Sequence, residues 1–205
     1  IFPDKTTYPI NETMLHNGPP HTSNDAYAYA KRMLEIHCKT YQEQYDDNFI
    51  CVIPTNIYGP HDNYSLNDGH VIPALTHRCY LAKKENIPFR VLGSGTPLRQ
   101  FIYSEDLAKL FMWTLENYDQ KETLILSVGE KNEVSIKKVA TEIAKSFNYE
   151  HMIEFDTRYA DGQFKKTADN TKLMNLIGKF KFTSIKKGIK KNTEWFIENF
   201  ESARK

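Results

Sequence analysis

Hydrophobic positions along the chain form helical stripes separated by short continuous apolar runs. Ser23 and Asn24 are good helix N-caps, and no glycine or proline follows before Tyr45, so we predict a helix that ends near Tyr45. The next apolar run, Phe49–Ile53, is ended by Pro54 and predicts a strand buried on both faces, as in a parallel sheet. A helix followed by such a strand is typical of an α/β unit.

The remaining chain mixes short strands with helices. We predict a loop rich in Pro, Gly, Asn and Asp over 55–69. Further helices are expected over about 70–84, 104–118, 135–147 and from 184, and strands over 89–92, 100–103, 124–128 and 152–155. We therefore predict an α/β fold in which a second lobe is interleaved with the end of a sheet.

The charge balance limits the kinds of partner. Lys and Arg number 27 and Asp and Glu number 26 among the 205 residues, a net charge of +1. A protein that follows nucleic-acid or membrane phosphates normally shows a clear cationic excess, so this balance argues against both. No apolar run approaches the roughly 20 residues that span a bilayer, which predicts a soluble protein.

The cysteines bear on the compartment. Cys38, Cys51 and Cys79 are odd in number, lack C-x-x-C spacing and follow no secretory segment. These features predict reduced thiols and a cytoplasmic location. The chain begins at Ile1 without a methionine, and we therefore expect a fragment of a longer protein.

Tyr27 and Lys31 lie one helical turn apart on the first predicted helix. The spacing alone is weak, because Tyr80 and Lys84 share it. Lys31, however, belongs to an apolar stripe that we expect to be buried, and a lysine there requires a reason. An ammonium beside a phenol stabilises the phenolate and makes the phenol a better proton donor to a carbonyl being reduced. A core tyrosine with a snorkelling lysine is the alternative.

The segment 55–60 directly follows the predicted buried strand. Ligands of open α/β sheets gather at the carboxyl ends of strands, so a cofactor or substrate is expected there, with an ordinary turn as the alternative. His70 opens a predicted helix, whose N-terminus disfavours the imidazolium and leaves the ring ready to release a proton. His61 and His77 are the nearby alternatives, and the absence of zinc-type spacing predicts no metal site.

Arg78 and Arg99 each follow an element that begins near this region, and guanidinium groups suit a diphosphate, although solvated arginines are the alternative. Gly93-Ser94-Gly95 is no dinucleotide fingerprint, because it lies between two strands and lacks a third glycine. No other phosphate-binding glycine motif occurs. The turn Asp161–Lys166 carries charge and an aromatic residue and is equally compatible with a surface loop.

Seven segments stand in a characteristic order: Ile1–Lys5, Tyr27-x-x-x-Lys31-Arg32-Met33, Pro54–Asn63, Asp68–Pro73, Gly93–Tyr103, Leu126–Glu130 and Asp161–Lys166. Together they resemble the extended short-chain dehydrogenase/reductase family, and within it the GDP-L-fucose synthases, over the whole chain. The resemblance implies the C-terminal part of a Rossmann-like doubly wound parallel sheet with a smaller mixed α/β substrate lobe. We place the end of the dinucleotide-binding domain at 1–66 and mainly the nucleotide-sugar-binding lobe, interleaved with returning sheet elements, at 67–205.

The resemblance also implies an activity and residue roles. Such enzymes epimerise the two carbons beside the ketone of GDP-4-keto-6-deoxy-D-mannose and then reduce the ketone with NADPH. Tyr27 would protonate the carbonyl oxygen, Lys31 would assist it and bond the nicotinamide ribose, and His70 would be the acid of epimerisation. The expected NADP(H)-binding residues are Lys31, Pro54, Thr55, Asn56, Ile57 and His70. The expected substrate-binding residues are Arg78, Leu92, Arg99 and Asp161.

Several features set limits on this interpretation. The family's Gly-rich loop, catalytic serine and base, a cysteine, precede the segment matched by Ile1, so we expect this chain alone to be an incomplete catalyst. Leu92 stands where many relatives carry an aromatic residue. Tyr29, Met33 and Ile36 form a second stripe suited to a homodimer contact. Another nucleotide-sugar epimerase or reductase of the family, and a non-catalytic nucleotide-sugar-binding or regulatory subunit, remain alternatives.

Overall fold

The computed structural model describes residues 1–205, and helix α1 (Asp25–Tyr45) has the predicted bounds. Asn24 is its N-cap residue, and Asp46 ends it with a left-handed backbone (φ 55°). The other helices are α2 (Val71–Glu85), α3 (Ser104–Asn117), α4 (Ile136–Ser146), α5 (Thr171–Ile177) and α6 (Ile185–Glu198). Ser135 and Ser184 cap α4 and α6 by accepting hydrogen bonds from Lys138 N and Lys187 N.

Parallel strand pairs connect distant parts of the sequence. Strand β1 (Val52–Pro54) pairs with β6 (Leu124–Leu126), and β2 (Asn56–Tyr58) pairs with β5 (Phe101–Tyr103). Strand β3 (Phe89–Leu92) pairs with β8 (Ile153–Asp156), also in parallel, whereas β4 (Leu98–Arg99) pairs antiparallel with β7 (Val134–Ser135). The chain therefore leaves the first lobe after β2 and returns to it at β5 and β6.

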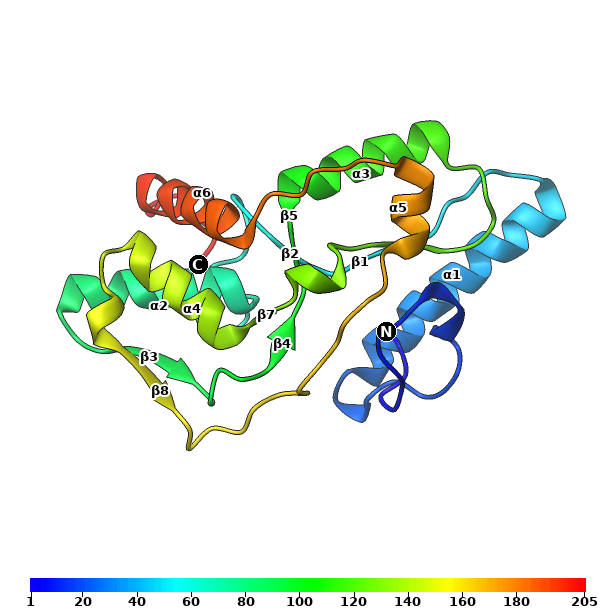
Figure 1. Cartoon of the computed structure of the whole chain (residues 1–205). Coiled ribbons are helices and arrows are strands. Elements are labelled where there is room, and N and C mark those ends of the chain that lie inside the picture. Colours follow the sequence, from blue (N-terminus) through cyan, green and yellow to red (C-terminus); the bar gives the residue numbers. More distant parts are fainter.

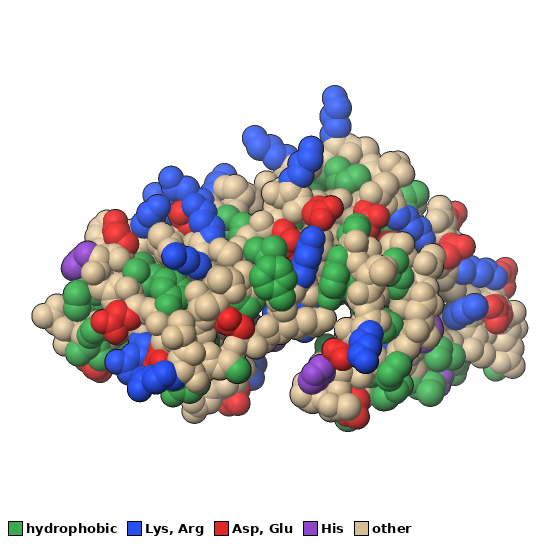
Figure 2. Space-filling model, turned by 60° about the horizontal axis from the view of Figure 1, so that its bottom comes forward, with side chains coloured by type: hydrophobic (Ala, Val, Ile, Leu, Met, Phe, Trp, Pro, Cys, Tyr) green, Lys and Arg blue, Asp and Glu red, His purple; other side chains and the backbone are tan.

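Two lobes result from this path (Figure 1). Helices α2, α4 and α6 lie with β3 and β8 on one side, and α1, α3 and α5 lie with β1 on the other. The space-filling view shows a notch between the lobes (Figure 2). None of the helices is both long and apolar enough to cross a membrane.

Each lobe has its own apolar core. The larger core contains 16 buried residues from α2, α4, α6 and β3 together with Tyr58, Phe101 and Tyr103 of β2 and β5. The smaller one is formed by α3, β6 and α5, with Ile102, Leu110 and Leu173 fully buried. Because β5 contributes Phe101 and Tyr103 to the first core and Ile102 to the second, its alternating side chains join the two lobes.

The prediction for the buried face of α1 is wrong. The buried residues of this helix are Ala28, Arg32 and Gln42, whereas the predicted apolar stripe, including Tyr27, Leu34 and Tyr41, is exposed. Arg32 is held inside because its Nε and Nη1 donate to the carbonyls of Ile1 and Gly18, each at 2.8 Å. The bulky apolar side chains of α1 consequently face away from the rest of the chain.

The run Phe49–Ile53 also differs from its prediction. The strand begins only at Val52 and is half-buried, and Phe49 is exposed. Strand β1 has a neighbour, β6, on one edge only, which leaves its other edge and part of its faces uncovered. Its partner β6 is fully buried. The structure adds elements that were not predicted, namely β2, β4, β7 and α5.

Candidate functional site

Tyr27 and Lys31 lie together on the outer face of α1. The Lys31 ammonium is 5.7 Å from the centre of the Tyr27 ring, and both side chains are exposed. The second pair with this spacing has the opposite environment, because Tyr80 stacks on Phe200 at 4.3 Å between ring centres in the core of the other lobe. Tyr27 and Lys31 thus offer a free phenol beside a free cation, whereas Tyr80 is a packing residue.

The segment 54–57 lies at the carboxyl end of β1 and the start of β2. The hydroxyl of Thr55 is buried and has no hydrogen-bond partner. The Asn56 side chain is engaged elsewhere, since its Nδ2 donates to the Gln100 carbonyl at 2.8 Å. The Ile57 side chain is exposed and Pro54 is half-buried. This strand end therefore presents one unpaired buried hydroxyl and an open apolar side chain, which suits a ligand.

The three histidines near this region have distinct surroundings. His77 is buried, its Nδ1 lies 2.8 Å from the Tyr64 carbonyl, and burial lowers the pKa of its ring. His61 packs on Trp195, with 4.5 Å between ring centres. His70 is the N-cap residue of α2, and its ring is exposed with Asp62 Oδ1 at 4.0 Å from Nδ1. His61 and His70 are both exposed, but His61 packs on Trp195, whereas the His70 ring makes no aromatic contact.

The four residues expected at the nucleotide line one cavity of about 360 Å³. Arg78 comes from α2, Leu92 from β3, Arg99 from β4, and Asp161 from the segment after β8. Gly69 and Val71, the neighbours of His70, line the same cavity. The structure thus joins elements that are up to 96 positions apart in the sequence, from Leu66 to Gly162, around a single space.

Unpaired cations lie at this cavity, where Arg78 and Arg99 line it, and beside it, where Lys166 is near Arg99. Neither Arg78 nor Arg99 has a carboxylate within 4.0 Å, and the same holds for Lys166. Burial lowers the pKa of Arg99, and desolvation followed by the Arg99 charge lowers the pKa of Lys166. Two like charges near one another favour binding of an anion.

Sequence reasoning missed two members of this region. Lys166 lies near enough to Arg99 for the Arg99 charge to help lower the Lys166 pKa, whereas the sequence places it only in a charged turn. Tyr8 comes from the N-terminal segment and accepts a hydrogen bond from Gln163 Nε2 at 2.8 Å. Burial raises the pKa of Tyr8, and the nearby Arg99 opposes this effect. No local sequence signal connects Tyr8 with residues 155 positions later.

Asp161 holds the segment that borders the cavity. Its Oδ1 accepts from Ser94 N at 2.9 Å, and its Oδ2 accepts from Ser94 Oγ at 2.6 Å. Gly93 has φ +91°, and a Cβ there would lie 2.5 Å from Asp161 Oδ1. Glycine is therefore required at this turn both for the backbone conformation and for the approach of the carboxylate.

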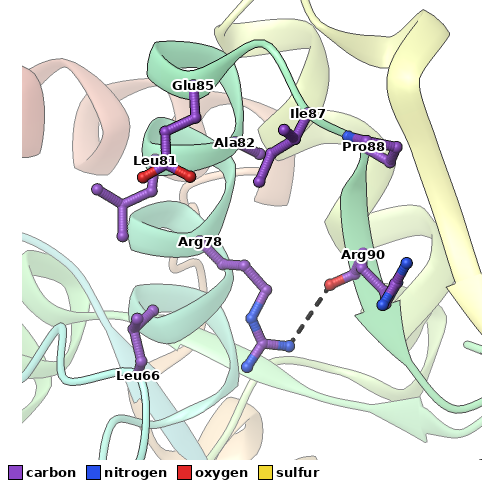
Figure 3. A pocket seen from close by; sticks show the side chains of 8 residues that line it. All are labelled: Leu66, Arg78, Leu81, Ala82, Glu85, Ile87, Pro88 and Arg90. Atoms are coloured by element: carbon purple, nitrogen blue, oxygen red, sulfur yellow. Dashed lines mark hydrogen bonds between the residues drawn. The ribbon is translucent and has the colours of Figure 1, made fainter.

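A second cavity of about 370 Å³ adjoins the first and shares Leu66 and Arg78 with it. Figure 3 shows Arg78 extending from α2 toward β3, where its Nη1 lies 3.5 Å from the Arg90 carbonyl. The long distance makes this a weak hydrogen bond. Little therefore restrains the Arg78 guanidinium from turning into either cavity.

Comparisons with known proteins agree with this fold. Residues 1–129 match the model of the NAD dependent epimerase/dehydratase family. The chain belongs to this family. Its Rossmann-like α/β fold and the predicted resemblance are thereby confirmed.

Individual relatives are similar along the whole chain. A GDP-L-fucose synthase of Dictyostelium discoideum is 58% identical over all 205 residues, which cover 64% of that relative. A probable GDP-L-fucose synthase of Drosophila melanogaster is 48% identical, with 100% of this chain and 66% of the relative covered. A solved GDP-L-fucose synthetase from Naegleria fowleri bound to NADP is 49% identical, with TM-score 0.97, and covers 100% of this chain and 63% of that one. This family member thus spans just under two thirds of the length of these relatives.

Proposed function

We propose that the protein is a GDP-L-fucose synthase, which epimerises GDP-4-keto-6-deoxy-D-mannose and reduces it with NADPH. The observation that carries the proposal is the cavity that Arg78 and Arg99 both line, neither of them with a carboxylate within 4.0 Å. A relative named GDP-L-fucose synthase is 58% identical to the chain. An arginine fork binds diphosphate through charge-assisted hydrogen bonds, and Leu92 supplies apolar surface beside it.

Reduction of the ketone is assigned to Tyr27 and Lys31. The Tyr27 phenol donates its proton to the carbonyl oxygen as the alkoxide forms, and the Lys31 ammonium stabilises the phenolate left behind. Both side chains are exposed, so substrate can reach them. Their proximity on one face of α1 fixes the phenol beside the cation before substrate arrives.

The residues near the end of β1 fit a nicotinamide cofactor. The buried Thr55 hydroxyl lacks a partner, the Ile57 side chain is open, and Lys31 offers a donor for a ribose hydroxyl. We propose that Lys31, Pro54, Thr55, Asn56, Ile57 and His70 hold this end of NADPH. When bound, NADPH supplies the hydride. Because the Asn56 amide already binds Gln100, Asn56 would shape the site through its backbone.

Epimerisation is assigned to His70. Removal of a proton from a carbon beside the ketone gives an enolate, and a proton must then return from the opposite face to invert the carbon. His70 stands at the edge of the cavity with an open ring and can supply that proton. The neighbouring Gly69 and Val71 line the cavity, so the ring is placed where a bound sugar extends from the diphosphate.

We further propose a cytoplasmic homodimer that uses the second apolar stripe of α1 and leaves Tyr27 and Lys31 uncovered. Tyr29, Met33 and Ile36 are 52%, 51% and 42% exposed, although together they form an apolar stripe. Exposed apolar surface of this kind is typical of protein interfaces. The three cysteines are free thiols, in keeping with a reducing compartment.

The test is product analysis with the full-length protein, GDP-4-keto-6-deoxy-D-mannose and NADPH. We expect NADPH oxidation coupled to GDP-L-fucose, identified by NMR. Tyr27→Phe should reduce turnover at least ~100-fold, the lower end of what a general acid contributes, and leave GDP affinity unchanged. Tyr45→Phe is the matched control, because Tyr45 lies on the same helix and is 58% exposed against 56% for Tyr27. A different product sugar, or binding without turnover, would overturn the proposal.

A further inference from the structure

The His70 ring needs a partner group outside α2 to fix its orientation. The side chain is 83% exposed and makes no hydrogen bond within the chain. A side chain so open samples several rotamers, whereas proton delivery to one face of an enolate requires one ring orientation. A group that fixes the ring would therefore contribute to the reaction.

Asp62 is the carboxylate that meets this ring. Its Oδ1 lies 4.0 Å from His70 Nδ1, and no other carboxylate lies within that distance of the ring nitrogens. The Asp62 side chain is only 19% exposed and accepts a hydrogen bond from Asn63 N at 2.7 Å. The carboxylate is thus the fixed partner and the imidazole the mobile one, so a small rotation of His70 brings Nδ1–H into hydrogen-bond range.

The loop that carries Asp62 is held from both sides. Tyr64 is fully buried, its N donates to the Arg204 carbonyl at 2.8 Å, and its hydroxyl donates to Asn192 Oδ1 at 2.7 Å. Within the loop, Gly69 N donates to the Ser65 carbonyl at 3.0 Å. The distance between Asp62 and the start of α2 is therefore set by packing against the C-terminal segment and does not depend on the bound substrate.

We propose that Asp62 is a positioning residue for His70, an inference that rests on the proposed function. Its carboxylate accepts from Nδ1–H and so leaves Nε2 to face the sugar. In the proton-transfer step, the Nε2–H bond breaks and its electrons stay on Nε2, the π electrons of the enolate C=C form the new C–H bond, and an oxygen lone pair re-forms the C=O bond. The ring becomes neutral and retains the Nδ1–H tautomer that Asp62 holds.

The experiment compares full-length wild type with Asp62→Ala, Asp62→Asn and the control Asp68→Ala. Asp68 lies in the same loop, with an exposed side chain two positions before His70. Nitrogen-15 NMR of histidine-labelled protein reports the His70 tautomer without substrate, and His70→Asn assigns the signal. Deuterium incorporation from solvent beside the ketone reports epimerisation.

We expect the Nδ1–H tautomer to predominate in wild type and Asp68→Ala, and to be lost in Asp62→Ala. Epimerisation should fall about 10- to 100-fold in Asp62→Ala, part of the ~10²–10⁴-fold that a general acid supplies, with KM almost unchanged. Asp62→Asn keeps the acceptor for Asn63 N. Its epimerisation rate should lie between those of wild type and Asp62→Ala. An unchanged tautomer in a folded Asp62→Ala or Asp62→Asn would overturn the proposal. Because the NMR signal requires no substrate, a tautomer change in a protein that makes no GDP-L-fucose would refute the proposed function alone.

Discussion

The Gln100 side chain ties together three segments inside the protein, and its loss should be costly. Its Nε2 donates to the carbonyls of Val128 and Ala168 at 2.8 and 3.0 Å, and its Oε1 accepts from Ala168 N at 2.7 Å. Gln100 is 1% exposed and Ala168 is 6% exposed, so water cannot replace these bonds. Val128 O keeps a second donor, the Ser127 hydroxyl at 2.9 Å, whereas both backbone groups of Ala168 lose their partner when the amide is removed.

Gln100→Met keeps most of the volume and deletes the polar groups, which isolates the hydrogen-bond effect. Each buried group left unpaired costs ~1–3 kcal/mol, so two groups predict a loss of roughly 2–6 kcal/mol in the free energy of unfolding. With a urea m-value of about 2–3 kcal/mol/M, the midpoint should fall by about 0.7–3 M. Gln120→Met, at an exposed position without a hydrogen bond, is the control and should change stability by less than ~0.5 kcal/mol. A loss below ~1 kcal/mol for Gln100→Met would refute the reasoning.

Three further predictions follow from the surroundings of single side chains. Burial lowers the pKa of His77 below its unfolded value of about 6.5, so its neutral form gives full stability above that pH, and stability falls as the pH drops below it. Urea unfolding at pH 7.5 and 5.5 should show this slope, and His77→Asn, which keeps a donor for the Tyr64 carbonyl, should reduce it. Ser94→Ala removes the 2.6 Å bond to Asp161 and should weaken GDP binding about 3- to 10-fold by calorimetry, and unchanged affinity would show that this bond does not shape the cavity. Burial raises the pKa of Cys79 to about 12, so iodoacetamide at pH 8 should leave it unlabelled in native protein and label it after denaturation, as read by peptide mass mapping.

Helix bounds were predictable because their signals are local. Asn24, Ser135 and Ser184 stand at the starts of α1, α4 and α6 as the sequence indicated. Strand β2 was missed because Asn56–Tyr58 shows neither alternation nor an apolar run and lies between two prolines. Its strand conformation comes from pairing with Phe101–Tyr103, which lies more than 40 residues away.

The buried face of α1 could not be predicted for a different reason. The rule that apolar stripes are buried fails where the burying contacts are polar, and here Arg32 enters the interior through carbonyls of Ile1 and Gly18. The candidate site likewise contains residues that the sequence could indicate and one that it could not. Arg78 and Arg99 could be proposed from their chemistry, whereas Tyr8 joins the region only through the folded path of the chain.

The long-range hydrogen bonds have a common consequence for the candidate site. Gln100 joins Asn56 to Ala168, and the buried Asp106 at the start of α3 accepts from Thr183 at the approach to α6. These contacts connect the end of β1, where the cofactor is proposed, with segments that lead to or from the other lobe. The relative position of the lobes is thus fixed by buried polar pairs, whose partners must all be present together. A substitution at Gln100 should therefore loosen the segments at Val128 and Ala168, whereas Asn56 in the proposed cofactor region keeps its bond to the Gln100 backbone carbonyl.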